Sequence, residues 1–155
     1  LIKNANIPFE LAFSKNNYVG RTFIKPTQEE REQAVHLKLS VLSDVVAGKG
    51  IVLIDDSIVR GTTIKNLITL LRDAGATEIH VRISSPPFLH PCYYGTDVPD
   101  NSQLIANNYS TESIREMIGA DSLGYMRLED LGSLVGDMPV CKACFDGIYP
   151  TKTDE

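Results

Sequence analysis

One stretch in the middle of the 155-residue chain limits the possible folds more than any other. Residues 51–54 form an apolar run that ends in Asp55 and Asp56. Such a run, in which apolar and polar residues do not alternate, is typical of a strand covered on both faces of a parallel sheet. Residues 64–71 then carry apolar side chains at helical spacing, and residues 78–83 alternate like a strand. This order predicts an α/β fold, with a mostly parallel sheet and flanking helices.

Other patterns predict the neighbouring elements of the first half. Thr27 and Glu30 have the spacing of a capping box, which predicts the start of a helix. Residues 35–41 alternate with period two like a strand, although a longer helix also fits this segment. Gly75 stands where a glycine commonly ends a helix.

The second half of the chain has shorter expected elements. Ser110 or Thr111 is placed to begin a helix that runs to Ile118 and ends at Gly119. We also expect a strand over 123–126, a helix over 128–134 and a turn-rich tail over 141–150.

Composition and charge exclude several classes of protein. Hydrophobic residues make up 43% and charged residues 23%, as in ordinary globular domains, which excludes collagen-like and disordered chains. With 15 basic and 20 acidic residues the net charge is −5, whereas a dedicated nucleic-acid binder carries a basic surface. All apolar runs are far shorter than the ~20 residues of a membrane span. No signal peptide opens the chain, so we expect a cytoplasmic protein.

The segment between the first predicted strand and its helix is rich in groups that bind phosphate. Ser57, Thr62 and Thr63 offer hydroxyl donors, and Gly61 allows a ligand to approach the backbone closely. The helix that follows presents unpaired N–H groups and the positive end of its dipole, which attract anions. In α/β sheets, ligands bind outside the carboxyl ends of the strands. We therefore expect a bound phosphate at this segment.

Asp55 and Asp56 would repel that phosphate unless they face another group. Sugar hydroxyls or Mg²⁺ fit, because carboxylates and phosphate oxygens are common Mg²⁺ ligands. The segment has neither the Gly-x-x-x-x-Gly-Lys motif of P-loop proteins nor the Gly-x-Gly-x-x-Gly dinucleotide motif. A solvated turn with a capping acid would explain the two aspartates alone, but not the whole arrangement.

Residues 51–63 resemble the motif with which type I phosphoribosyltransferases bind phosphoribosyl pyrophosphate (PRPP): an apolar strand, two acids and a short loop that ends Gly-Thr-Thr. The version found here, Asp-Asp-Ser-Ile-Val-Arg-Gly-Thr-Thr, is similar to that of the glutamine PRPP amidotransferases. Residues 18–24, 82–87, 118–123 and 143–150 match further blocks of that family. The resemblance therefore extends over nearly the whole chain.

The resemblance implies a glycosyltransferase that catalyses the first step of de novo purine biosynthesis. An N-terminal glutaminase domain of the family releases ammonia from glutamine, and the phosphoribosyltransferase domain adds this ammonia to C1 of PRPP and expels pyrophosphate. The chain resembles only the C-terminal part of the second domain, so we expect the glutaminase domain and the start of the fold to be absent and the chain alone to be inactive. Residues 1–26 would include the flexible loop of the family, 27–84 the PRPP-binding core and 85–155 a cysteine-bearing region. The family forms homotetramers and is inhibited by purine nucleotides.

The same resemblance assigns roles to individual residues. By this resemblance, Asp55 and Asp56 hold the ribose hydroxyls and Mg²⁺. The catalytic residues are Asp55, Asp56 and Arg21. The cradle for the 5-phosphate consists of Ser57, Arg60, Gly61, Thr62 and Thr63, and the loop that closes over PRPP contributes Lys15, Tyr18, Arg21 and Thr22. Asn17 stands where many members have an arginine, so one positive contact to pyrophosphate or to an inhibitor is missing here.

The three cysteines are candidate ligands of a metal site. Cys141 and Cys144 form a Cys-x-x-Cys pair, and Cys92 lies two residues after His90. Judged by spacing alone, a Cys₃His zinc site, an iron–sulfur cluster and no metal all remain open. The resemblance is to the iron–sulfur branch of the family, which implies a structural [4Fe–4S] cluster whose fourth thiolate lies upstream of this chain. Such a cluster would hold the C-terminal segment near Cys92.

Two other functions are weighed against the enzyme. A non-catalytic PRPP-binding regulator would add a DNA-binding domain and a basic surface, and the net charge of −5 disfavours it. A phosphoribosyltransferase that acts on a free purine base is disfavoured by the cysteine-bearing tail and by residues 84–87.

Overall fold

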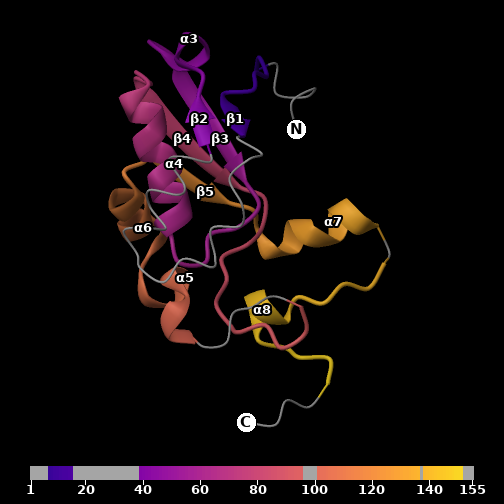
Figure 1. The fold of residues 1–155 in the computed structure, drawn as a ribbon. Coiled ribbons are helices and arrows are strands. Elements are labelled where there is room, and N and C mark those ends of the chain that lie inside the picture. Colours follow the sequence, from indigo (N-terminus) through magenta and orange to yellow (C-terminus); the bar gives the residue numbers. More distant parts are fainter. Residues whose placement is uncertain (1–6, 16–38, 96–100, 137, 152–155) are drawn as a thin grey trace. The chain divides into compact units, whose positions relative to one another are not determined.

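The computed structural model describes residues 7–15, 39–95, 101–136 and 138–151 (Figure 1). Its residues group into two compact units, each described separately below. The first unit consists of Leu1–Ile51 and Asn66–Glu78, and the second of Val52–Lys65 and Ile79–Glu155. The helix start predicted at Thr27 and the block at 18–24 lie outside the described residues.

A small antiparallel ribbon begins the first unit. Strand β1 (Phe13–Lys15) pairs with strand β2 (Leu39–Val41), with Phe13 opposite Val41. The pairing continues through the Leu42 amide, which donates to the carbonyl of Ala12 at 2.9 Å. Residues 39–41 are thus a strand, as the period-two pattern predicts, and a short helix α3 (Ser43–Val46) follows directly.

A second sheet has three strands in the order β3-β4-β5. These are β3 (Gly50–Asp55), β4 (Glu78–Ile83) and β5 (Ser122–Tyr125). Strands β4 and β5 are parallel, with His80 opposite Ser122 and Ile83 opposite Tyr125. Both β3 and β4 match the strands predicted from the sequence, and β5 lies one residue before the predicted range.

Strand β3 runs in the same direction as β4. At the start of the pair, the Thr77 amide donates to the Lys49 carbonyl at 2.9 Å, and at its end the Ser84 amide donates to the Asp55 carbonyl at 3.0 Å. Because the residue numbers rise together along both strands, the pairing is parallel. The expected parallel sheet is therefore confirmed, and Asp55 lies at its carboxyl edge.

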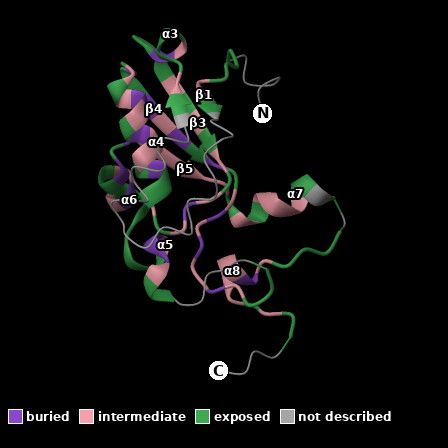
Figure 2. Ribbon diagram, viewed as in Figure 1, coloured by how far each residue is buried: buried purple, intermediate pink, exposed green. Residues whose placement is uncertain are grey.

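Helix α4 (Thr62–Asp73) connects β3 to β4, and its buried residues recur at helical spacing (Figure 2). Ile64, Ile68 and Leu71 are all at most 2% exposed. The helix ends as predicted at Gly75, whose φ of 95° is favourable for glycine. The next amide, of Ala76, donates to the Leu71 carbonyl at 3.0 Å, which gives the bond pattern of a Schellman motif.

The second unit contains the remaining helices and 3₁₀ turns. They are η2 (Asn101–Gln103), α5 (Ile105–Asn108), α6 (Thr111–Ile118), η3 (Leu128–Asp130), α7 (Leu131–Val135) and α8 (Ala143–Asp146). Helix α6 begins after Ser110, whose hydroxyl accepts from the Ser113 amide at 3.2 Å, and it ends at Gly119 with φ 78°. Both ends agree with the sequence prediction. The tail, predicted as turns, instead forms the short helix α8.

A hydrophobic cluster in the second unit joins segments that are far apart in the sequence. Phe88 and Leu104 are buried, and Val59, Cys144 and Phe145 pack against them. The rings of Phe88 and Phe145 meet edge to face, with centroids 5.1 Å apart. Such packing fixes short elements that have little stability of their own.

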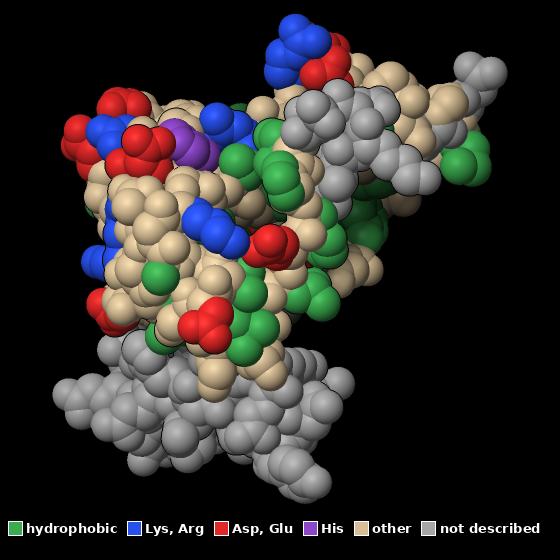
Figure 3. Space-filling model, turned by 90° about the horizontal axis from the view of Figure 1, so that it is seen from above, with side chains coloured by type: hydrophobic (Ala, Val, Ile, Leu, Met, Phe, Trp, Pro, Cys, Tyr) green, Lys and Arg blue, Asp and Glu red, His purple; other side chains and the backbone are tan. Residues whose placement is uncertain are grey.

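No helix in the described ranges is both long enough and apolar enough to cross a membrane. On the face drawn in Figure 3, lysine and arginine side chains lie among aspartates and glutamates.

Leu104 should contribute far more to stability than an exposed leucine. It is fully buried, whereas Leu134 is 65% exposed. We expect Leu104→Ala to lower the free energy of unfolding by about 2–5 kcal/mol, because the truncation leaves a cavity, and Leu134→Ala to change it by less than about 1 kcal/mol. Urea unfolding measures both values, and equal losses would contradict the packing described.

Candidate functional site

The candidate site starts at the carboxyl end of β3, where the sequence places two acids. Asp55 is the last residue of the strand and is half-buried. Its carbonyl accepts from the Ser84 amide at 3.0 Å and from the Ser84 hydroxyl at 3.2 Å. Its carboxylate accepts from the Asp56 amide at 2.9 Å. Asp56 is exposed, and its own carboxylate accepts from the Ser57 hydroxyl at 3.1 Å.

The surroundings of Asp55 make its negative charge costly. Burial raises the pKa of the Asp55 carboxyl, and the neighbouring charge of Asp56 raises it further, while the hydrogen bond from the Asp56 amide opposes the shift. A cation or sugar hydroxyls bound to this carboxylate would compensate that cost.

The loop after the acids leads directly into α4. Gly61 accepts the first helical hydrogen bond, from the Lys65 amide at 3.0 Å, so the helix begins at Thr62. The sequence places Thr62 and Thr63 in the loop, but the structure places them in the first turn of the helix. Their side chains are exposed.

Backbone donors are concentrated in this segment. Within the described part of the chain, the amides from Ser57 to Thr63 have no hydrogen-bond acceptor. The first N–H groups of any helix lack intrahelical partners, and here the preceding loop adds more. Such a row of donors, next to the positive end of a helix dipole, is suited to a phosphate.

Position 61 requires a glycine, both for its backbone conformation and because a larger side chain would not fit. Its φ is 80°, and a Cβ at this position would lie 2.9 Å from the Ile105 side chain. Any larger residue would be strained and would also displace Ile105.

Residues outside the predicted motif hold the loop from the other side. The Ile105 amide donates to the Val59 carbonyl at 2.9 Å, and an Arg60 guanidinium nitrogen donates to the Gln103 side-chain oxygen. Ile58 is buried. Nothing near the loop in the sequence signals a contact with residues more than forty positions away, so Gln103 and Ile105 could not be predicted as part of the site.

The remaining predicted residues of the PRPP site are only partly described. Lys15 is the last residue of β1, and its side chain is not described. Tyr18, Arg21 and Thr22 lie outside the described residues, as does Asn17. The closing loop therefore stays a prediction.

The three cysteines lie in one neighbourhood of the second unit. Burial raises the pKa of the Cys144 thiol, and the charges of Cys92 and Cys141 raise it further. In the described ranges, however, no three His, Cys, Asp or Glu side chains converge closely enough to hold a single metal ion.

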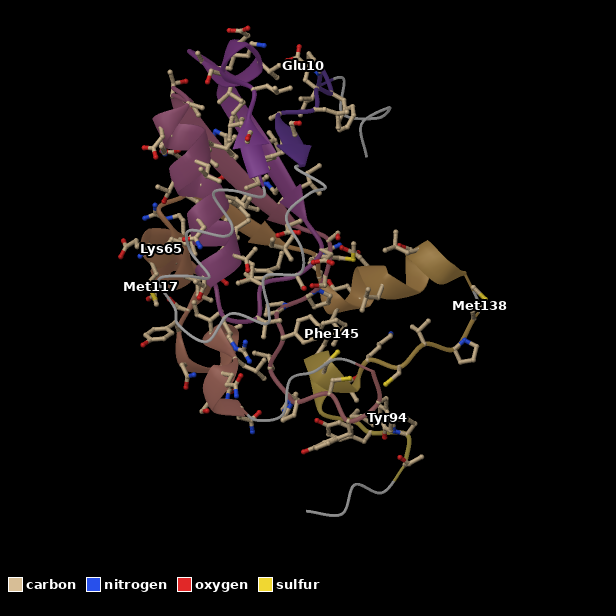
Figure 4. The ribbon with its side chains drawn as sticks, in the orientation of Figure 1. Glu10, Lys65, Tyr94, Met117, Met138 and Phe145 are labelled. Carbon is tan, nitrogen blue, oxygen red and sulfur yellow. The ribbon has the colours of Figure 1, made fainter. Side chains whose placement is uncertain are left out.

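Several contacts fasten the cysteine-bearing tail to residues 88–95. The amides of Leu89 and His90 both donate to the Cys144 carbonyl, at 3.0 and 3.1 Å. The Tyr149 hydroxyl donates to the Pro91 carbonyl at 2.8 Å, and the Tyr94 and Tyr149 rings lie 6.4 Å apart. Figure 4 labels Phe145 on α8 and Tyr94 on the segment beside it.

Two further hydroxyls lie at the carboxyl edge of the sheet. Ser85 follows β4 and Tyr125 ends β5, and the hydroxyl oxygens of both are buried without a hydrogen-bond partner among the described residues. Burial raises the pKa of Tyr125 to about 12. No feature of the sequence pointed to this pair.

Asp55→Asn should stabilise the folded chain. The neutral amide avoids the cost of burying a carboxylate and keeps an oxygen for the Asp56 amide, so at neutral pH we expect Tm to rise by about 1–3 °C. Because the pKa of Asp55 is raised, wild-type stability falls as pH rises through that value. The rise in Tm of Asp55→Asn over the wild type should therefore vanish near pH 3, where the Asp55 carboxyl is neutral in both the folded and the unfolded chain.

Thermal unfolding at the two pH values tests this expectation. Asp44→Asn, at an exposed carboxylate in the first turn of α3, is the matched control and should not raise Tm. A lower Tm for Asp55→Asn at neutral pH would show that the carboxylate stabilises the fold instead.

Comparison with known proteins gives consistent relatives. Amidophosphoribosyltransferase of Bacillus subtilis is 53% identical over 152 residues, which cover 94% of this chain and 32% of the relative. The amidophosphoribosyltransferase of Methanocaldococcus jannaschii is 49% identical over 152 residues, which cover 98% of this chain and 32% of the relative. No protein-family model matches the chain.

Solved structures agree with these relatives. Glutamine PRPP amidotransferase from B. subtilis, complexed with ADP and GMP, matches with a TM-score of 0.82 and 50% identity over 97% of this chain and 34% of that one. A structure described as the allosteric regulatory enzyme of purine biosynthesis matches with a TM-score of 0.83 and 51% identity, again over 97% and 34%. The expected phosphoribosyltransferase-type fold is thus confirmed. The chain spans about a third of the length of the relatives it matches, and over nearly all of its own length it is homologous to the amidophosphoribosyltransferases.

Proposed function

We propose that this chain carries the PRPP-binding part of an amidophosphoribosyltransferase, which forms phosphoribosylamine from PRPP and ammonia derived from glutamine. The observation that carries the proposal is the acid pair at the end of β3, followed by backbone donors that lead into α4. This arrangement offers separate groups for the phosphate and for the sugar of PRPP. Identity of about 50% to enzymes of that name supports it.

The loop and the start of α4 form the cradle for the 5-phosphate. The amides of residues 57–63 donate to phosphate oxygens, and the hydroxyls of Ser57, Thr62 and Thr63 add further donors. Arg60 supplies positive charge from an exposed position. Binding here fixes one end of PRPP, so that the reacting carbon is held at a constant place.

The two aspartates orient the ribose. Asp55 and Asp56 accept hydrogen bonds from its hydroxyls, and their oxygens are also suitable ligands for Mg²⁺. The donor set fits, because in the described part of the chain the half-buried Asp55 carboxylate accepts one hydrogen bond, from the Asp56 amide, and burial raises the pKa of its carboxyl. When bound, Mg²⁺ would neutralise charge on the pyrophosphate.

The reaction needs no nucleophile from the protein. The bond between C1 and the pyrophosphate oxygen breaks, the ammonia nitrogen bonds to C1, and one proton leaves that nitrogen. The sugar passes through a positively charged, oxocarbenium-like state, which the aspartates stabilise electrostatically. In this proposal, Lys15, Tyr18, Arg21 and Thr22 close over PRPP and exclude water.

The proposed partners follow from the same site. The B. subtilis relative was solved with ADP and GMP, and purine nucleotides carry the phosphate–ribose unit that the cradle would recognise. We therefore expect them to compete with PRPP. A glutaminase domain that supplies ammonia and a homotetrameric assembly complete the proposal.

Calorimetric titration of the chain with PRPP and Mg²⁺ tests the site. We expect binding by the wild-type chain and by Asp44→Asn, and a loss of at least about tenfold in affinity for Asp55→Asn, because a neutral amide cannot hold Mg²⁺ as a carboxylate does. If Asp55→Asn binds PRPP as tightly as the wild type, Asp55 does not have this role. Because this variant should be more stable than wild type, unfolding would not explain a loss of binding.

We also propose that Cys92, Cys141 and Cys144 are three thiolate ligands of a structural [4Fe–4S] cluster, with the fourth supplied from outside this chain. The segment that carries Cys144 lies against the one that leads to Cys92, since the Cys144 carbonyl accepts from the Leu89 and His90 amides. A zinc ion needs its ligands at about 2.3 Å from a single centre, whereas the thiolates of a cluster bind different irons. The resemblance to the iron–sulfur branch of the family favours the cluster over a Cys₃His zinc site.

Bound at these thiols, the cluster would supply strong bonds between the tail and Cys92. The protein side of this link is already formed, since the Cys144 carbonyl accepts two amides from residues 89 and 90. Coordination requires deprotonated sulfur, so metal binding must overcome the raised pKa of Cys144.

Iron and sulfide analysis of a full-length amidophosphoribosyltransferase that carries this stretch tests the cluster. We expect iron, sulfide and a visible absorption band in the wild type, and loss of all three in Cys141→Ser. Met138→Leu, which removes a nearby exposed sulfur that is not a thiol, should keep them. Zinc in place of iron, or no metal in the wild type, would contradict the proposal.

A further inference from the structure

We infer that Gln103 is a positioning residue that holds Arg60, and with it the phosphate loop of residues 56–61, in the conformation that binds a phosphoribosyl ligand. The inference rests on the proposed function for the identity of the ligand. It concerns a residue outside the PRPP motif, on the 3₁₀ turn η2.

The first observation is a polar contact between exposed groups. A guanidinium nitrogen of Arg60 donates to the side-chain oxygen of Gln103, across 43 positions of the sequence. Arg60 has a long side chain with several rotatable bonds, and fixing it before the ligand arrives lowers the entropy lost on binding. Gln103 is uncharged, so it holds the guanidinium without offsetting its positive charge.

The second observation is that the same turn also holds the loop backbone. The Ile105 amide, two residues after Gln103, donates to the Val59 carbonyl at 2.9 Å. The Ile105 side chain fills the space beside Gly61, where a Cβ would meet it at 2.9 Å. Figure 1 shows α5, which Ile105 begins, beside the N-terminal end of α4. Consecutive loop residues are thus held by one short segment.

The third observation is that this segment is itself firmly anchored. Leu104 is fully buried and Ile105 is 7% exposed. The Leu104 amide donates to the Asn101 carbonyl at 3.1 Å, and the Asn108 side chain donates to the Leu104 carbonyl at 3.1 Å. Gln103 therefore belongs to a fixed turn, and its hydrogen bond restricts the conformations of the Arg60 side chain.

The loop needs such external support because it has little of its own. Between Asp55 and Gly61 no backbone amide except that of Asp56 has a hydrogen-bond acceptor among the described residues. A loop whose donors are kept for a ligand is stabilised only by what packs against it. Gln103 and Ile105 supply that support without occupying the donors.

Three substitutions separate the role of Gln103 from a general effect on stability. Gln103→Met keeps the length of the side chain but removes the acceptor. Gln103→Glu keeps an acceptor for Arg60. Asn107→Ala, at an exposed position on α5, is the matched control.

The first measurement is amide hydrogen exchange of Ile105 and Lys65 in the ligand-free chain, because their amides donate to the loop carbonyls of Val59 and Gly61 and exchange only when these contacts open. We expect roughly tenfold faster exchange in Gln103→Met, from the loss of one hydrogen bond to a charged group, and rates near wild type in Gln103→Glu and Asn107→Ala. Tm should stay close to that of the wild type in all three. Unchanged exchange in Gln103→Met would overturn the inference.

The second measurement is the affinity for PRPP with Mg²⁺ in the same variants. Gln103→Met should bind roughly tenfold more weakly, and in an Arg60→Met background it should cause no further loss, because Gln103 acts through Arg60. Additive losses would overturn that route. If the wild-type chain does not bind PRPP, the proposed function fails, whereas the exchange rates still decide whether Gln103 holds the loop.

Discussion

The parallel pairing of β3 with β4 is the constraint on which the candidate site depends. Because the Ser84 amide bonds to the Asp55 carbonyl, the chain leaves β3 at the same edge at which it leaves β4. That edge presents Asp55 and then the row of amides that leads into α4. Any shift of one residue in the register would turn Asp55 to the opposite face of the sheet. The sheet therefore determines both where the acids lie and which way they point.

The site also shows where stability is given up for binding. Asp55 carries a charge in a half-buried position, where the raised pKa of its carboxyl reports an unfavourable environment. The hydroxyls of Ser85 and Tyr125, at the same edge, are buried without described partners. Unsatisfied polar groups are rare in protein interiors, and they tend to collect where a ligand binds. This pattern supports a binding site even before relatives are considered.

Patterns within short stretches predicted most of the central fold. Strands β3 and β4, helix α4 with Gly75, and helix α6 between Ser110 and Gly119 follow from local periodicity and capping residues. The turn η2 and helices α5 and α8 were not predicted, because each is short and is held by packing of Leu104 and Phe145 against distant residues. For the same reason the acid pair and the loop could be found in the sequence, whereas Gln103 could not.

We propose that residues 57–63 form a cradle for a sugar phosphate that is folded before the ligand binds. Titration of the ¹⁵N-labelled chain with ribose 5-phosphate, followed by ¹H–¹⁵N spectra, tests it most directly, since each loop amide reports separately. We expect the amides of residues 57–63 to shift first and together, in a chain whose other resonances change little. Shifts concentrated elsewhere, or none in this loop at saturating ligand, would contradict it.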